Sequence, residues 1–172
     1  SCGHALCIID SQASHADLTD EYAAIPGELK QVCAYFGKEV LTQVPEAEFY
    51  ASIPALRKCC PDRAILRAIH IYQDNARVPQ QVQALREGNF DKFLTLVKQS
   101  GHSSYMYLQN VIPAGYIEHQ DVAVALALCE HYLQGRGAYR VHGGGFAGTV
   151  QAFVPVDLLE EFRSGLDAAL GE

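Results

Sequence analysis

The sequence predicts an α+β fold in which helices pack on one face of an antiparallel sheet. A short apolar run occupies residues 5–9, and two further β-branched runs surround a glycine-rich segment at 143–148. The remaining segments place apolar side chains at three- and four-residue spacing, which is typical of amphipathic helices. The predicted order is strand, helices, strand, strand, helix. Because the 172 residues contain no Ser/Pro-rich linker and no internal repeat, we expect residues 1–172 to form a single domain.

The first elements are a strand and a long helix. Residues 5–9, Ala-Leu-Cys-Ile-Ile, are too few for a helix and predict a buried strand. An apolar stripe then predicts a helix that ends before Gly37, and Asp17 or Thr19 is expected to cap its start. Pro26 lies inside this stripe and removes one backbone donor, so we expect either a first turn of different pitch or a kink near Tyr22.

Three helices are expected in the middle of the chain. The first is short and covers residues 45–53, and the second begins at Pro61 and is expected to bend at Pro79. The third is capped by Asn89 and runs to Gly101. The buried face of the second helix is predicted to include Ile65, Leu66, Ile69, Tyr72, Ala76, Val82 and Leu85.

The end of the chain combines helices with the two remaining strands. Residues 101–117 have a mixed pattern, whereas residues 121–134 are strongly periodic and predict a helix. Strands are expected at 139–142 and 149–154, followed by a closing helix within 157–170. The helix that begins at residue 121 is predicted to bury Val122, Ala125, Leu126, Cys129 and Leu133.

Composition excludes several classes of protein. The charged residues give a net charge of −7 at pH 7, so the overall field repels nucleic acid and anionic lipid. No run of 18 apolar residues predicts a membrane span. Ser1 is not preceded by Met or by a signal-peptide pattern, so we interpret this start as a cut or processed end. A chain with this apolar content does not need disulfide bonds between its six cysteines to fold. We therefore expect reduced thiols and a cytoplasmic location.

The glycine-rich segment is the strongest local motif. Gly143, Gly145 and Gly148 satisfy G-x-G-x-x-G, but a β-branched run follows them where a dinucleotide-binding fold requires a helix. A dinucleotide site is therefore excluded by context. Two interpretations stay open: a hairpin turn that needs positive φ, or a close backbone approach to a ligand or another loop.

Other chemistry-bearing residues form no recognisable constellation. The His and Cys spacings match no zinc site, so no metal ligand is predicted. Cys33 and Cys129 lie on apolar helix faces, where inert buried thiols are expected. Ser103 and Ser104 are interpreted as helix-capping residues, with phosphate binding at a helix start as the alternative.

The motif and its surroundings resemble a known family. Residues 140–148, Arg-Val-His-Gly-Gly-Gly-Phe-Ala-Gly, with the strand at 150–155, are similar to the third motif of the GHMP small-molecule kinases, and most similar to the galactokinases. Further segments occur in the order found in galactokinase C-terminal halves: Asp17-Leu18-Thr19-Asp20-Glu21-Tyr22, Phe36-Gly37-Lys38-Glu39-Val40-Leu41, Arg67-Ala68-Ile69-His70, Asn75-x-Arg77-Val78 and Ala84-Leu85-x-x-Gly88-Asn89-Phe90.

The resemblance implies a ferredoxin-like C-terminal domain that closes one side of a cleft for ATP and sugar. The full enzyme would use ATP and Mg²⁺ to phosphorylate galactose at its anomeric hydroxyl. The phosphate loop and the catalytic groups belong to an N-terminal half that is absent here, so no catalytic residue, metal ligand or bound cofactor is expected in this chain. The partners implied are that N-terminal half and a small sugar, with a dimer through the exposed interdomain face when the half is missing.

The resemblance also implies site residues. Tyr22 corresponds to a tyrosine that lies against the sugar, and Gly143, Gly144, Gly145 and Gly148 correspond to the loop lining the cleft. Tyr22 is followed by Ala-Ala-Ile-Pro in place of the family's N-x-R-R. The alternative function is therefore a stand-alone binding or regulatory module that keeps the fold without the chemistry.

Overall fold

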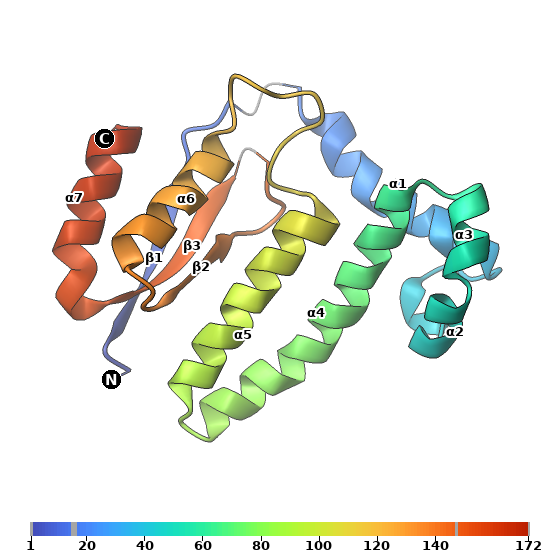
Figure 1. Cartoon of the computed structure of the whole chain (residues 1–172), viewed down its shortest axis with the longest axis horizontal. Helices are drawn as coiled ribbons and strands as arrows, with labels where there is room; N and C mark the ends of the chain where they lie inside the picture. Colours follow the sequence, from blue (N-terminus) through green and yellow to red (C-terminus); the bar gives the residue numbers. More distant parts are fainter. Residues whose placement is uncertain (1, 15–16, 147, 172) are drawn as a thin grey trace.

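The structure is a computed structural model that describes residues 2–14, 17–146 and 148–171. It combines a small antiparallel sheet with a set of helices (Figure 1). The strands are β1 (His4–Asp10), β2 (Ala138–Val141) and β3 (Thr149–Pro155). The α-helices are α1 (Thr19–Tyr35), α2 (Glu46–Ala51), α3 (Ile53–Cys59), α4 (Asp62–Arg86), α5 (Phe90–Ser103), α6 (Asp121–Leu133) and α7 (Leu159–Leu170). Short helical turns occupy Leu41–Gln43, Ser104–Leu108 and Val156–Leu158. The predicted α+β class is confirmed.

The sheet has β3 at its centre, in the order β1-β3-β2, and both neighbours run antiparallel to it. Side chains alternate between the faces of a strand. Val150, Ala152 and Val154 of β3 therefore share one face, where they are buried against α6 and α7. The main core thus lies between the sheet and these two helices, which Figure 1 shows side by side at the left.

Helix α5 lies against the other face of the sheet, at β2, so the helices cover both faces rather than the one face that the sequence predicted. Phe93 meets Phe153 edge-on with ring centroids 5.3 Å apart. A Cβ at Gly101 would lie 2.7 Å from the Cβ of Arg140, so only glycine lets α5 approach the strand this closely. The outer part of this face, on β1, is left uncovered, and Leu6 and Ile8 are 61% and 53% exposed there.

A second core joins α1, α2, α3 and α4, away from the sheet. Val32, Phe49, Leu56, Ala64 and Ala68 are fully buried in it. Figure 1 shows that α4 and α5 form a long hairpin between this helical part and the sheet. The hairpin therefore connects the two cores.

Several local expectations are wrong. Neither Asp17 nor Thr19 caps α1, because Leu18 occupies the N-cap position without a side-chain cap and Thr19 already lies inside the helix. The short helix expected at residues 45–53 is present as α2, but it ends at Ala51, and the helix α3 that follows was not expected; Pro54 lies in the first turn of α3, where its missing N–H costs nothing. Both α1 and α4 continue through their prolines as single helices, so neither proline ends its helix, and the distortions expected at Pro26 and Pro79 stay predictions. Asn89 caps α5 as predicted, because its side chain accepts from the backbone N–H of Lys92.

The predicted buried face of α4 is correct only in its first half. Ala76, Val82 and Leu85 are exposed, whereas Ala84 is fully buried. Beyond Tyr72, α4 packs mainly against α5. The face of α4 that is buried in this contact differs from the face on which the apolar residues are spaced. Periodicity identifies an apolar stripe but not the neighbour that covers it.

Candidate functional site

The structure brings Tyr22 and the glycine loop, residues 143–148, together. The hydroxyl of Tyr22 donates to the carbonyl oxygen of Gly145 at 2.8 Å. Its ring lies so close to Gly144 that a Cβ there would be 2.9 Å from Cε1 of the tyrosine. The same ring meets Phe146 edge-on, with centroids 5.2 Å apart. Residues more than 120 positions apart in the sequence therefore form one contact surface.

Gly145 combines both of the roles that the sequence leaves open. Its φ is +84°, a value that favours glycine. In addition, a Cβ at Gly145 would overlap the carbonyl oxygen of Asn110 and lie 2.8 Å from its Nδ2. The following residue, Phe146, donates its backbone N–H to that oxygen at 2.6 Å. The backbone at Gly145 therefore lies close to another segment of the same chain, the one that contains Asn110.

The other glycines of the loop are less constrained. Gly143 has φ +64° but open space where a Cβ would be. A Cβ at Gly148 would lie 3.1 Å from the carbonyl oxygen of Gly145. The carbonyl of Gly148 accepts from the hydroxyl of Ser11 at 2.7 Å, which fastens the loop to the end of β1. Ala147, where the family has glycine, lies outside the described residues.

Sequence reasoning missed Asn110, which is 1% exposed and holds the loop from behind. Its Oδ1 accepts from the hydroxyl of Ser104 at 2.7 Å, and its Nδ2 points to the carbonyl of Gly144 at 3.5 Å. Gln109 before it has φ +55°, which turns the chain out of the π turn. The predicted caps Ser103 and Ser104 lie at the end of α5 and are buried, so the capping interpretation is wrong. No local pattern in the mixed segment 101–117 indicated this clamp.

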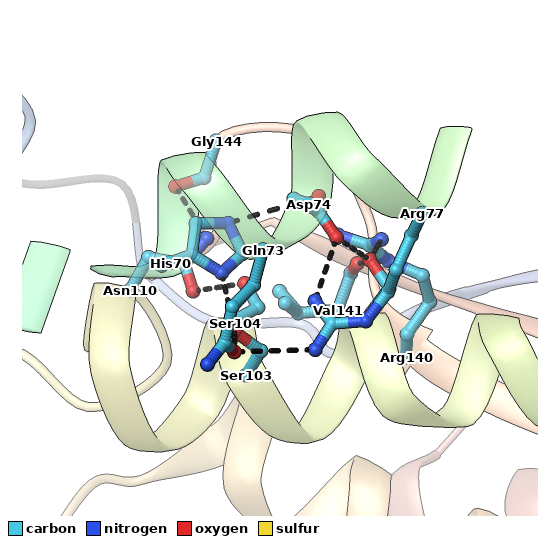
Figure 2. Close-up of polar contacts among 11 residues, drawn as sticks. His70, Gln73, Asp74, Arg77, Ser103, Ser104, Asn110, Arg140, Val141 and Gly144 are labelled. Carbon is cyan, nitrogen blue, oxygen red and sulfur yellow. Dashed lines mark hydrogen bonds and ion pairs between the residues drawn. The ribbon is translucent and has the colours of Figure 1, made fainter. Parts of the chain in front are cut away.

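A buried polar network continues from this clamp between α4, α5 and β2 (Figure 2). His70 places Nδ1 2.9 Å from the hydroxyl of Ser103 and Nε2 3.8 Å from a carboxylate oxygen of Asp74. The other carboxylate oxygen accepts from the hydroxyl of Ser100 at 2.7 Å. Arg140 of β2 donates to that same hydroxyl and, from Nε, to the carbonyl of Val141 at 2.9 Å.

Ser103, His70 and Asp74 are the residue types of a serine hydrolase's catalytic triad, but here the serine and the histidine are buried. His70 and Ser103 are 4% and 2% exposed, so no substrate can reach the hydroxyl. Burial lowers the pKa of His70 despite the attraction of Asp74, and the positive charges of Arg140 and Arg77 lower it further. Burial likewise lowers the pKa of Arg140. The network therefore serves to hold β2, the stem of the glycine loop, against the α4–α5 hairpin.

A second ionic cluster fixes the start of the same segment. Arg67 is fully buried and pairs with Glu28 of α1, which also binds Arg63. Arg67 donates through Nε to the carbonyl of Leu108 at 2.8 Å, just before the clamp. Burial lowers the pKa of Arg67, and the carboxylate of Glu28 opposes that shift. A buried cation with these partners orders α1, α4 and the segment that leads to the loop.

A cavity of about 460 Å³ opens beside the loop. It lies between the start of α1 and the segment before α6. Its lining residues are Gln12, Ala13, Ser14, Leu18, Val111, Pro113, Tyr116, His119, Gln120, Asp121 and Phe146. The described residues contain no group of three or more His, Cys, Asp or Glu side chains that could hold a metal ion. Within the same ranges, no helix is long and apolar enough to cross a membrane.

Comparisons with known proteins agree with this fold. No family model matches the chain. Its fold is that of a domain in the crystal structure of Lactococcus lactis galactokinase complexed with galactose, with a TM-score of 0.72 and 23% identity, over 98% of this chain and 42% of that one. This likeness defines the fold: the chain is an α+β domain of the same architecture as that domain.

Sequence likeness narrows this class. The chain is 30% identical to the galactokinase of Thermotoga neapolitana over 171 residues, which are 97% of the chain and 43% of that protein. It is 27% identical to the galactokinase of Glaesserella parasuis, over 94% of the chain and 40% of that protein. Together these likenesses support a C-terminal galactokinase domain, as the glycine motif predicted. The chain spans about two fifths of the curated relatives it matches.

Proposed function

We propose that the chain is the C-terminal domain of a galactokinase-like kinase that transfers the γ-phosphate of ATP to the anomeric hydroxyl of galactose. The observation that carries this proposal is the likeness to galactokinases over 94% of the chain, in a single stretch of 161 residues. That stretch is long enough to contain most of the sheet, the helical hairpin and the clamp behind the glycine loop. Because the chain spans only part of those relatives, the reaction belongs to a longer protein.

In this proposal Tyr22 and the glycine loop form one wall of the substrate cleft. Phosphoryl transfer depends mainly on the positioning of the reactants and on charge stabilisation. A rigid cleft wall would help to hold the substrate in position. Gly145 is held by Tyr22 on one side and Asn110 on the other. The hydroxyl hydrogen of Tyr22 is donated to Gly145, so Tyr22 can offer a sugar its ring and its hydroxyl oxygen as an acceptor.

We place the Mg-ATP site outside this chain. A phosphate cradle needs converging backbone N–H groups or a cluster of cations, and Mg²⁺ needs oxygen ligands. The sequence contains no phosphate loop of the family's type, and we assign these functions to the N-terminal half. Calorimetric titration of this chain with Mg-ATP is therefore expected to show weak binding at most. Micromolar affinity would contradict this assignment.

The surface around the loop supports a partner domain. Tyr22 and Tyr116 are 37% and 41% exposed, and Ile117 is 85% exposed on the neighbouring segment. Exposed apolar side chains gathered beside a cleft are typical of an interface. We infer that the N-terminal half covers this face, and that residues 1–172 fold as one domain beneath it. Without that half, this face would bind an apolar dye or dimerise.

The test is to extend the coding sequence upstream and to express the longer product. We expect it to form ADP from Mg-ATP only when galactose is present, with glucose as the control sugar, and phosphorus NMR should find the phosphate on the anomeric oxygen. A longer product without a phosphate loop, or one that binds galactose without phosphorylating it, would favour the stand-alone module. In the active protein, Gly145→Val should raise both KM values and lower kcat per folded molecule.

A further inference from the structure

Phe146 has a backbone conformation that is unusual for a bulky side chain. Its φ is +53°, and it directly follows Gly145, whose φ is +84°. Among the described residues, the others with a positive φ that are not glycine are all polar: Gln12, Asp17, Gln109 and Gln134. A bulky residue keeps a left-handed backbone only where its surroundings hold it, and such positions gather at functional sites. The contacts of Phe146 therefore indicate what this conformation achieves.

Both the backbone and the ring of Phe146 are fixed. Its N–H donates to the carbonyl oxygen of Asn110 at 2.6 Å. Its ring is 2% exposed and packs in a small apolar cluster with Leu18 and Ile25. Leu18 is the N-cap of α1, and Ile25 lies within that helix. Phe146 thus joins the glycine loop to the start of the helix that carries Tyr22.

The hydrogen bond from Tyr22 to Gly145 does not set the plane of the tyrosine ring. The hydroxyl oxygen of a tyrosine lies on the Cβ–Cγ axis about which the ring turns, so rotation about χ2 leaves this oxygen in place. The torsion itself has only a broad, roughly two-fold preference. The bond to Gly145 therefore fixes where the ring ends, but not which face or edge the ring turns toward the cleft.

Contact with Phe146 supplies the missing restraint. The two rings lie at 89° to each other with centroids 5.2 Å apart, which is the edge-to-face arrangement that aromatic pairs prefer. Because Phe146 is held in its own cluster, it cannot follow a rotation of the Tyr22 ring, and such a rotation would cost the contact. The ring of Tyr22 is thus held at two points, its hydroxyl and its flank.

We propose that Phe146 is a positioning residue that sets the plane of the Tyr22 ring and thereby the surface that a sugar meets. This inference rests on the proposed function, because the ring plane matters to the reaction only if Tyr22 lies against the substrate. The negative face of an aromatic ring attracts the C–H groups of a hexose, whereas its positive edge does not. Tyr22 is 37% exposed, so its ring has surface left for such a contact.

The kinetic experiment compares Phe146→Leu with Phe49→Leu in the longer protein that phosphorylates galactose. Phe49 is the matched control: it is also fully buried and also contacts a tyrosine ring, 5.1 Å away at Tyr72, but it lies in the second core. Phe146→Leu should raise the KM for galactose about fivefold and leave kcat and the KM for ATP within about twofold, because a stacking contact is made equally in the ground state and the transition state. Phe49→Leu should change none of these constants per folded molecule.

Two kinetic results would refute the proposal. One is an unchanged KM for galactose in Phe146→Leu, and the other is an equal effect of the two substitutions. Phe146→Gly removes the ring and suits the positive φ, so it should act in the same direction as Phe146→Leu without the backbone strain.

The rate at which the Tyr22 ring flips gives a second measurement that needs no activity. In the 172-residue chain labelled with ring-¹³C tyrosine, the Tyr22 signal is the one among nine tyrosines that Tyr22→Phe removes. Relaxation dispersion should show flips about tenfold faster in Phe146→Leu and unchanged in Phe49→Leu. Unchanged flips in Phe146→Leu would overturn the role of Phe146. A longer protein that does not phosphorylate galactose would overturn the proposed function instead, and the flip rate would still decide whether Phe146 sets the ring plane.

Discussion

Replacing Gly145 with alanine tests whether the glycine loop is held by the Asn110 clamp. A Cβ at this position would overlap the carbonyl oxygen of Asn110 and would lie 2.9 Å from its carbonyl carbon. Gly143 is a matched control, because it shares the positive φ but has open space around the same atom. The two substitutions therefore differ in the clamp and not in the backbone conformation.

The magnitudes follow from these contacts. A left-handed backbone costs a residue with a Cβ about 1–2 kcal/mol, and both variants bear that cost. Gly145→Ala must also displace the Asn110 backbone, which breaks the bond from Phe146 and disturbs a buried amide, for about a further 2–3 kcal/mol. We expect Gly143→Ala to lose about 1–2 kcal/mol of unfolding free energy and Gly145→Ala about 3–5 kcal/mol.

Urea unfolding followed by circular dichroism measures this difference. The two variants should show similar slopes with denaturant concentration, so that the shift in midpoint reports stability. Equal losses for Gly143→Ala and Gly145→Ala would refute the reasoning, because the clamp would then add nothing to the strain of positive φ. A larger loss for Gly143→Ala would refute it more strongly.

Three further substitutions test the supports of the loop. Arg67→Met should cost about 2–4 kcal/mol of unfolding free energy, because it leaves the carboxylate of Glu28 with Arg63 as its remaining cation and removes the donor to the carbonyl of Leu108; a loss below about 1 kcal/mol would contradict this role. Burial lowers the pKa of His70 in the folded protein. As the pH falls below about 6.5, His70 is therefore protonated in the unfolded chain before it is protonated in the folded one, and the free energy of unfolding declines. In thermal melts between about pH 7 and pH 5, His70→Gln should reduce that decline, whereas substitution of the exposed His102 by Gln should leave it unchanged. The same dependence of melting temperature on pH in the unsubstituted chain and in both variants would disprove this role of His70. Tyr22→Phe removes the donor to Gly145 and should cost about 0.5–1 kcal/mol, since the site is partly open to water; amide exchange in the loop should rise, and unchanged exchange would count against the contact.

Local patterns were sufficient for most of the secondary structure. The helix α6 buries all five residues that its spacing indicated, although Val124 on another side of the helix is also apolar and is 51% exposed. The glycine loop lies between two strands as predicted, since β-branched runs on either side of glycines favour an antiparallel pair. The resemblance at residues 140–148 led to the galactokinase type of fold from the same local signal.

The candidate site was predictable only in part. Tyr22 and the glycine loop were named from the sequence, and the structure places them in contact. Their role toward a sugar is still a prediction. Asn110 was not named, because an asparagine in an irregular segment carries no sign of which distant backbone it will contact.

The sequence by itself determined the order of strands and helices and the need for glycine near residue 145, because both depend on the chemistry of neighbouring residues. Tertiary structure alone decided which face of α4 is buried, that Arg67 and His70 lie inside the protein, and that Asn110 holds the loop. These outcomes depend on contacts between segments that are far apart in the chain. Such contacts are selected by packing and by the partners available to buried polar groups, which no local pattern encodes.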